Sequence, residues 1–170
     1  MKEITFRNDV LPLKNELYRL ALRITMNREE AEDIVQETLI KVWNRRNEWE
    51  NIESIEAYSL TVCRNLAHDA IKKMGNQVES IETIGIDSVD KSSTPYEQMM
   101  HKDRISLVRQ LIDSLPEKQR SCMQLRDIEG KPYKEIATVL GITEEQVKVN
   151  IFRARQAIKQ KYQEYEQYGL

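Results

Sequence analysis

The sequence is poor in helix breakers, cysteines and aromatic residues, and each shortage excludes a class of protein. Its 170 residues include five glycines, four prolines and two cysteines, with 6% aromatic and 32% charged residues. This composition is typical of an all-helical protein. Cys63 and Cys122 lie far apart without a CxxC motif, so we expect small buried residues rather than a zinc site. His68 and His101 have no catalytic serine or cysteine arrangement around them, so we expect neither an enzyme nor a cofactor.

Long apolar runs are also missing. No segment approaches the ~20 apolar residues that span a bilayer, and the opening stretch MKEITFRNDVLPLK does not form a signal peptide. We therefore expect a cytoplasmic protein without membrane insertion. The net charge of −2 means that a nucleic-acid partner would require a locally basic surface.

Apolar residues recur at helical spacing on both sides of a stretch that has no such pattern. The stretch Gly75–Pro95 is polar, carries little positive charge and ends in Ser, Thr and Pro, as linkers do. The sequence thus predicts an all-α fold with two small helical domains, residues 1–74 and 96–170, joined by a flexible linker at 75–95. The expected core positions of the first domain are Leu13, Leu17, Leu20, Ala21, Ile24, Ala31, Val35, Thr38, Leu39, Val42, Leu60, Cys63, Ala67, Ala70 and Ile71.

The second domain contains the pattern of a helix-turn-helix. Tyr133–Leu140 forms a short amphipathic helix, and Gly141 supplies a sharp turn. Thr143 followed three residues later by Gln146 is a capping box, which starts a longer helix there.

The longer helix has an unusual outward face. At about 100° per residue, one stripe is apolar and faces the core, namely Val147, Ile151, Ala154 and Ile158. The opposite side mixes apolar and cationic residues, which suits base edges and phosphates in a major groove. We predict that this side binds duplex DNA through Lys148, Val149, Asn150, Phe152, Arg153, Arg155 and Lys159. Two alternatives stay open: the motif is only a packing unit, or Phe152 packs on the helix before Gly130.

A second outward face lies on the helix that begins after Asn27. Asn27 is its expected cap, acids crowd its first turns and bases its end. One face places an apolar side chain among polar ones, which is typical of a protein-docking surface. The candidate docking residues are Asp33, Gln36, Glu37 and Ile40. Since a single exposed apolar residue is ordinary, a merely solvated face remains the alternative.

The stretch from Arg45 to Lys73 combines aromatic rings with cations. Rings that stack on unpaired bases and cations that hold the backbone are features of single-stranded DNA sites. The candidate residues are Trp49, Tyr58, Arg64, Asn65, Lys72 and Lys73, with the Asn65 amide suited to read an extruded base. The alternative is that both rings belong to the core.

Three segments in order resemble a known family. They are REEAEDIVQETLIKVW (Arg28–Trp43), AYSLTVCRNLAHDAIKK (Ala57–Lys73) and the stretch from LIDSLPEKQR to NIFRARQAIK (Leu111–Lys159). Together they resemble a bacterial extracytoplasmic-function (ECF) sigma factor of the sigma-70 family, with a region-two domain followed by a region-four domain. The resemblance covers nearly the whole chain apart from the linker and the ends.

The resemblance implies a role for each surface. DIVQE, Asp33–Glu37, matches the segment that docks on the clamp helices of core RNA polymerase. Asn65 and the loop Asn47–Ile55 with Trp49 match the elements that capture a flipped base of the melted minus-ten element. The helix around Phe152 matches the one that reads the minus-thirty-five element. The implied partners are core RNA polymerase, duplex and single-stranded promoter DNA, and an anti-sigma factor.

The sequence departs from the family at several positions. Asn150 stands where many relatives have a cation, Glu144–Glu145 is an uncommon pair, and Tyr58 stands where tryptophan is common. Two other functions remain open at this point. One is a self-sufficient helix-turn-helix repressor or activator, which would need a dimer interface to span two half-sites. The other is a helical adaptor that binds only proteins, which would leave the basic face of the last helix unexplained.

Overall fold

The chain folds into helices that pack in two halves, an N-terminal half (residues 3–78) and a C-terminal half (residues 95–167). The computed structural model describes residues 3–78 and 95–167. The elements, in chain order, are η1 (Phe6–Val10), η2 (Leu11–Leu13), α1 (Lys14–Thr25), α2 (Arg28–Asn44), η3 (Arg46–Asn51), α3 (Ile55–Val78), α5 (Pro95–Asp113), α6 (Glu117–Met123), η4 (Gln124–Ile128), α7 (Tyr133–Leu140) and α8 (Glu144–Gln167). Every element in these ranges is helical, and none of these helices is both long and apolar enough to cross a bilayer.

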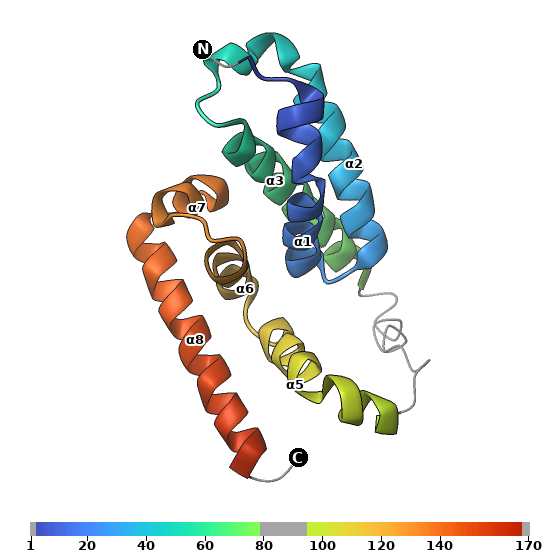
Figure 1. Ribbon diagram of the computed structural model, residues 1–170, viewed down its shortest axis with the longest axis vertical. Helices are drawn as coiled ribbons and strands as arrows, with labels where there is room; N and C mark the ends of the chain where they lie inside the picture. The colour runs from blue at the N-terminus through green and yellow to red at the C-terminus, as the bar shows by residue number, and fades with distance from the viewer. Residues whose placement is uncertain (1–2, 79–94, 168–170) are drawn as a thin grey trace.

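In the N-terminal half, α1, α2 and α3 pack pairwise into a three-helix bundle (Figure 1). The reversal between α1 and α2 uses Met26 in the left-handed conformation, with φ of 56°. Asn27 then caps α2, as predicted, because its side chain accepts a hydrogen bond of 2.9 Å from the Glu30 amide. Leu17, Leu20 and Leu60 are fully buried between the helices.

The C-terminal half confirms the predicted helix-turn-helix. Gly141 ends α7 in the left-handed conformation, with φ of 68°. Thr143 and Gln146 form the reciprocal capping box, with the two hydrogen bonds at 2.9 and 3.1 Å. Val147, Ile151 and Ala154 of α8 are buried, as the helical projection predicts. The helix-turn-helix is therefore α7, the Gly141 turn and α8.

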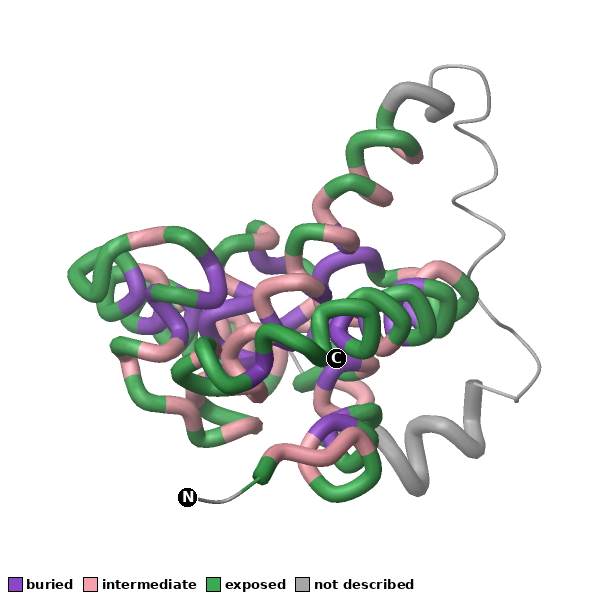
Figure 2. Tube along the Cα trace, turned by 90° about the horizontal axis from the view of Figure 1, so that it is seen from above, coloured by how far each residue is buried: buried purple, intermediate pink, exposed green. Residues whose placement is uncertain are grey.

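The two halves share one hydrophobic core. Residues of α6, η4 and α7, such as Cys122, Leu125 and Ile136, belong to the same buried cluster as Leu17 and Leu20 of α1. Figure 1 shows α6 beside α1 and α7 beside α3, and the buried segments meet in the middle of the view in Figure 2. The sequence predicts two domains on a tether, whereas the structure brings them into direct contact.

Arg120 joins the halves at the centre of this interface. Its buried guanidinium on α6 donates hydrogen bonds to the carbonyls of Arg23 and Ile24 at 2.8 and 3.3 Å, and to Leu115 at 2.7 Å. The carbonyls in the last turn of a helix lack partners within the helix and carry partial negative charge. Arg120 therefore caps the end of α1 from the other half of the chain.

Ion pairs line the rest of the interface. The Lys131 ammonium lies 2.6 Å from Glu16 of α1 and 2.8 Å from Glu56 of α3. Burial opposes its charge, but the hydrogen bonds to the two carboxylates outweigh burial and raise the pKa of Lys131. Arg19 of α1 pairs with Glu129, and His68 of α3 lies 2.8 Å from Glu117 of α6. Each pair joins one half to the other.

The end of α3 and the start of α5 lie at different residues from the expected linker boundaries. The helix α3 continues through Gly75 to Val78, beyond the predicted boundary at residue 74. A glycine inside a helix costs about 1 kcal/mol relative to alanine but does not by itself end the helix. The helix α5 begins at Pro95, a favoured residue for the first helical position. Residues 79–94 of the predicted linker lie outside the described residues.

We predict that Arg120→Ala lowers the free energy of unfolding by about 2–3 kcal/mol, because three carbonyls, two of them in buried contacts, lose a charged donor. Urea unfolding followed by circular dichroism measures the change. Lys118→Ala is the matched control, since Lys118 is an exposed cation on the same helix, and we expect a change within about 0.5 kcal/mol. Equal stability of Arg120→Ala and the parent would contradict the capping role.

A second prediction concerns the two cysteines, which are free and buried, as the sequence indicated. Burial raises the pKa of the Cys63 and Cys122 thiols to about 12 each. Since the thiolate is the reactive form, both should react with a thiol reagent at about pH 8 at least ~100-fold more slowly in the native protein than in urea. Rapid reaction without denaturant would show that the shared core opens readily.

Candidate nucleic-acid and protein interfaces

The exposed face of α2 carries the predicted docking residues. Asp33, Gln36 and Glu37 are exposed, and Ile40 has 58% of its surface accessible. The opposite face of the helix is anchored in the core by Ala31, Ile34, Val35, Thr38 and Val42. The structure therefore places one apolar side chain among polar ones on a rigid, well-capped helix, as a docking surface requires.

A hollow lies beside Asn65 where the end of α2 faces α3. It has a volume of about 420 Å³ and is lined by Lys41, Asn44, Arg45, Tyr58, Val62, Asn65, Leu66 and Asp69. The Asn65 side chain is exposed, and its carbonyl oxygen accepts a hydrogen bond of 3.1 Å from Arg64. Cations, an aromatic ring and an amide are thus gathered at the predicted base-capture site.

Trp49 does not have the role that the sequence suggested. Only 6% of its surface is accessible, and its indole N–H donates to the Val42 carbonyl at 3.1 Å. The ring packs with Val10 and Val42, so it is not available to stack on a base. The core alternative is correct for this tryptophan. The hydrogen bond from Trp49 to Val42 therefore fixes η3 against α2.

Trp43 is an exposed ring on α2 that was not among the predicted DNA-binding residues. It lies edge-on to both Phe6 and Trp49, and the Arg46 guanidinium sits 4.4 Å from its ring centre. A cation beside an exposed ring is suited to unpaired bases. Helical spacing could have indicated this exposure, because Trp43 follows Val42 and therefore lies outside the buried stripe of α2. Tyr58 is half-buried, and Lys72 and Lys73 are exposed on α3.

The outward face of α8 is exposed, as the helical projection predicts. Lys148, Val149 and Arg153 are exposed, and Phe152 has 62% of its surface accessible. Phe152 therefore does not pack on the segment before Gly130, and that alternative is wrong. The Lys148 ammonium lies 5.6 Å from the ring centre of Tyr133, at the start of α7.

Three other predicted residues of α8 differ in their surroundings. Arg155 is engaged in a two-point ion pair with Asp127, whose second contact, from Nε to Oδ2, measures 3.1 Å. Phosphate binding by Arg155 would therefore compete with this carboxylate, which sequence spacing did not reveal. The Asn150 side chain donates to the Gln146 carbonyl at 2.8 Å, while Lys159 is exposed.

Two protein-family models match the chain. The model for sigma-70 region 2 matches residues 10–76, and the model for sigma-70 region 4 matches residues 105–158. Together they cover the bundle with its docking face and the helix-turn-helix, in the order that the sequence resemblance implies. The chain belongs to the ECF sigma factors of the sigma-70 family. Such sigma factors direct RNA polymerase to promoters and are not enzymes in themselves, so membership favours this function over the repressor and adaptor alternatives.

Similar proteins from several bacteria support the assignment. The chain is 31% identical to the ECF RNA polymerase sigma factor SigE of Mycolicibacterium smegmatis over 85% of its own length, and spans 56% of that protein. It is 29% identical to the RNA polymerase sigma-H factor of Pseudomonas aeruginosa, covering 88% of this chain and 81% of the relative. It is also 29% identical to the ECF RNA polymerase sigma-E factor of Escherichia coli K12, covering 77% and 73%.

Two solved structures show the same fold. The sigma factor RpoE of Bartonella quintana, solved with the anti-sigma factor NepR, is 24% identical with a TM-score of 0.73, covering 91% of this chain and 94% of that one. CnrH, solved in complex with the cytosolic domain of CnrY, is 18% identical with a TM-score of 0.62, covering 91% of this chain and 84% of that one.

Proposed function

We propose that this ECF sigma factor docks on core RNA polymerase through α2 and recognises a promoter at two separate places. Asp33, Gln36, Glu37 and Ile40 form the docking face. The hollow beside Asn65 takes a base from the melted downstream element, and the outward face of α8 reads the upstream duplex. The observation that supports this division is that the two nucleic-acid surfaces lie on different halves of the chain, each outside the shared core.

Promoter binding requires the halves to separate. The two promoter elements are named for positions about 25 base pairs apart, which is roughly 85 Å of duplex at about 3.4 Å per pair. A folded chain of this length has a radius of gyration of only about 15 Å, and α3 contacts α7 directly. We therefore propose that the structure is a closed form, and that docking on polymerase breaks the contacts around Arg120 and Lys131.

The proposed setting follows from the proposed partners. Core polymerase and promoter DNA place the protein in the cytoplasm. RpoE was solved with the anti-sigma factor NepR, and we propose that an anti-sigma factor likewise controls this chain. Base capture and duplex reading are binding steps, and melting uses their free energy to offset an unstacking cost of a few kcal/mol.

We predict that Asp33→Arg combined with Glu37→Arg abolishes retention of core polymerase, because the docking face changes from acidic to basic, while stability changes by less than about 1 kcal/mol. A pull-down with purified core polymerase measures retention. Glu164→Arg with Glu166→Arg makes the same charge change on exposed positions near the end of α8 and should leave retention intact. Full retention by the first pair would remove the docking assignment.

A further prediction separates the two DNA sites. Asn65→Ala should retain polymerase yet fail to open a duplex promoter, because loss of a base contact costs about 1–3 kcal/mol. Arg153→Ala should instead weaken binding of the polymerase complex to the promoter before it melts, since it removes a contact to the upstream duplex. The measurement is transcription from duplex templates and from templates already melted at the downstream element.

The two variants serve as controls for each other. Pre-melting should restore transcription by Arg153→Ala and only partly restore it for Asn65→Ala, whose captured base still lacks its partner. If Asn65→Ala transcribes the intact duplex like the parent, base capture at the hollow is wrong. If pre-melting leaves Arg153→Ala inactive, then α8 does more than hold the upstream duplex.

A further inference from the structure

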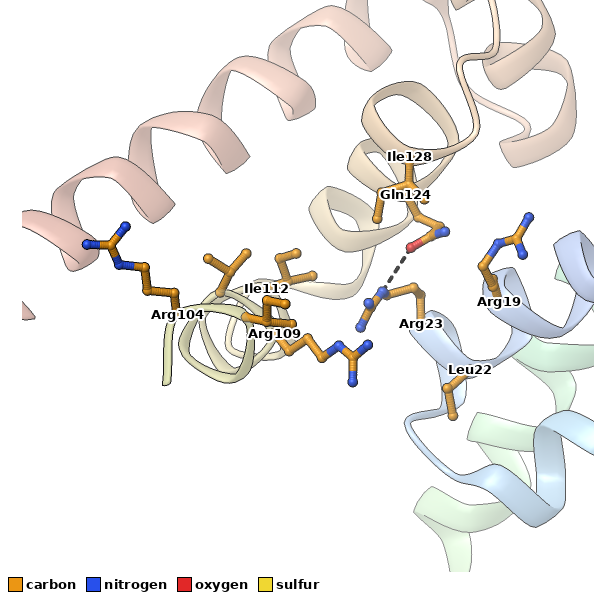
Figure 3. Close-up of a pocket in the computed structure, with 10 residues that line it drawn as sticks. Arg19, Leu22, Arg23, Arg104, Arg109, Ile112, Gln124 and Ile128 are labelled. Carbon is orange, nitrogen blue, oxygen red and sulfur yellow. Dashed lines mark hydrogen bonds between the residues drawn. The ribbon is translucent and has the colours of Figure 1, made fainter. Parts of the chain in front are cut away.

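The hollow between α1, α5 and η4 contains arginines that already have partners within the chain (Figure 3). The Arg23 guanidinium donates to the Gln124 side-chain carbonyl at 2.9 Å, as the dashed line shows, and lies 3.2 Å from Asp113. Arg19 is paired with Glu129. A ligand that bound these two arginines would have to displace the partners they have.

A second cavity, between α3 and α7, contains a polar group without such a partner. The cavity has a volume of about 560 Å³, within the range of roughly 300–1,000 Å³ that is usual for small-molecule sites. Ile52, Ala57 and Pro132 supply apolar surface, and Glu135 and two threonines supply polar groups. Apolar walls with a few polar groups are the usual composition of a site for a small organic molecule.

The fold leaves the carboxylate of Glu135 unsatisfied. Its Oε2 atom is buried and has no hydrogen-bond partner among the residues that the structure describes. Lys131 attracts this carboxylate, but the Lys131 ammonium is held by Glu16 and Glu56. Burial, together with repulsion from Glu56, therefore raises the pKa of Glu135. A buried carboxylate in this position is stabilised by any ligand that brings a donor with a positive charge.

The other charges at the cavity also favour a cation over an anion. The charged residues that line it are the carboxylates of Glu53 and Glu135 and the ammonium of Lys134. Lys134 is exposed and so keeps its hydration, whereas Glu135 is half-buried. Tyr58 adds an aromatic ring, and a cation near the face of such a ring is attracted by its quadrupole. A positively charged ligand therefore gains more here than a negatively charged one.

We propose that this cavity binds a small organic cation, namely an amine or guanidine on an apolar body. A change of rotamer turns the half-exposed Glu135 carboxylate toward the ligand, whose N–H groups donate charge-assisted hydrogen bonds to it. The carbon body of the ligand covers Ile52, Ala57 and Pro132. A metal ion fits less well, because the described residues hold no group of three or more His, Cys, Asp or Glu that could ligate one.

The cavity is separate from the surfaces of the proposed function. The docking face of α2 and the outward face of α8 contribute none of its lining, and Tyr58 is the lining residue that it shares with the Asn65 hollow. Glu135, Lys134 and Thr138 all lie on α7, so variants at these positions leave Tyr58 and the loop Asn47–Ile55 unchanged. Amine binding can therefore be measured on the full chain without polymerase or DNA.

The binding test is an NMR titration of the full chain with 2-phenylethylamine, which near neutral pH carries an ammonium on an apolar body. The matched probes are 2-phenylethanol, which lacks the charge, and 3-phenylpropionate, which reverses it. The amine should shift signals of residues that line the cavity, with a Kd of about 1 mM, as suits a ligand of about nine non-hydrogen atoms. The other two probes should bind at least about tenfold more weakly, because neither donates a charged hydrogen bond to Glu135.

Three variants test the position of the amine. Glu135→Gln keeps the shape of the side chain and removes its charge, so amine binding should weaken about tenfold or more. Glu164→Gln makes the same change on an exposed carboxylate near the end of α8 and should bind like the parent. Thr138→Trp, at an exposed position of α7, should fill the cavity and abolish binding. Circular dichroism confirms that each variant is folded.

The melting temperature without ligand gives a second measurement. Glu135→Gln should melt at the same temperature as the parent or higher, because it removes a buried charge that has no donor. A lower melting temperature would mean that the carboxylate already has a stabilising partner and does not need a ligand.

Several binding results would overturn the proposal. Equal binding of the amine by Glu135→Gln and Glu164→Gln would place the ligand elsewhere, and equal binding of 2-phenylethanol would show apolar contacts alone. Stronger binding of 3-phenylpropionate, lost in Lys134→Gln, would assign the cavity to an anion. If none of the three probes shifts any signal at about twenty times the expected Kd, water satisfies Glu135 and the cavity is not a cation site.

Discussion

The closed arrangement depends on the buried guanidinium of Arg120. A helix end that faces protein rather than water needs donors for its last carbonyls, and α1 ends against the C-terminal half. Arg120 supplies those donors from α6 while also holding the Leu115 carbonyl. Removing Arg120 therefore costs more than one contact, because it leaves the end of α1 unsatisfied in the shared core. The ion pairs of Lys131 and Arg19 extend the same connection along the interface.

We propose that this connection between the halves is exchanged for contacts with polymerase and promoter DNA. Burying a charged interface costs desolvation, which offsets much of the attraction in ion pairs such as Lys131 with Glu16. An interface of this kind can be exchanged for another one without unfolding either half, provided that the new contacts are at least as favourable. In the proposed function, polymerase and promoter contacts replace the interface between the halves. The proposed docking and DNA-binding surfaces lie outside the shared core.

The two tryptophans show where residue type is insufficient to assign a role. Trp43 ends the stretch before the loop Asn47–Ile55 and Trp49 lies within it, and residue type alone does not show which ring is exposed. Trp49 is buried with its N–H on the Val42 carbonyl, while Trp43 is exposed beside Arg46. The difference arises from packing of η1 and η3 around the end of α2, which brings Phe6 and Val10 to these rings. These contacts join segments that do not share a helical pattern, so a helical pattern alone does not show which tryptophan is buried.

Local physical rules determined much of this protein from its sequence alone. The capping groups of Asn27 and Thr143, the left-handed Gly141 and the apolar periods of α1, α2, α7 and α8 depend on neighbours within a few residues, so the helices and their exposed faces were predictable. The tertiary structure alone decided the shared core, the Arg120 cap, the pairing of Arg155 with Asp127 and the cavity between α3 and α7. These features join residues far apart in the chain, and no periodicity or spacing specifies which distant charge or apolar face will meet which.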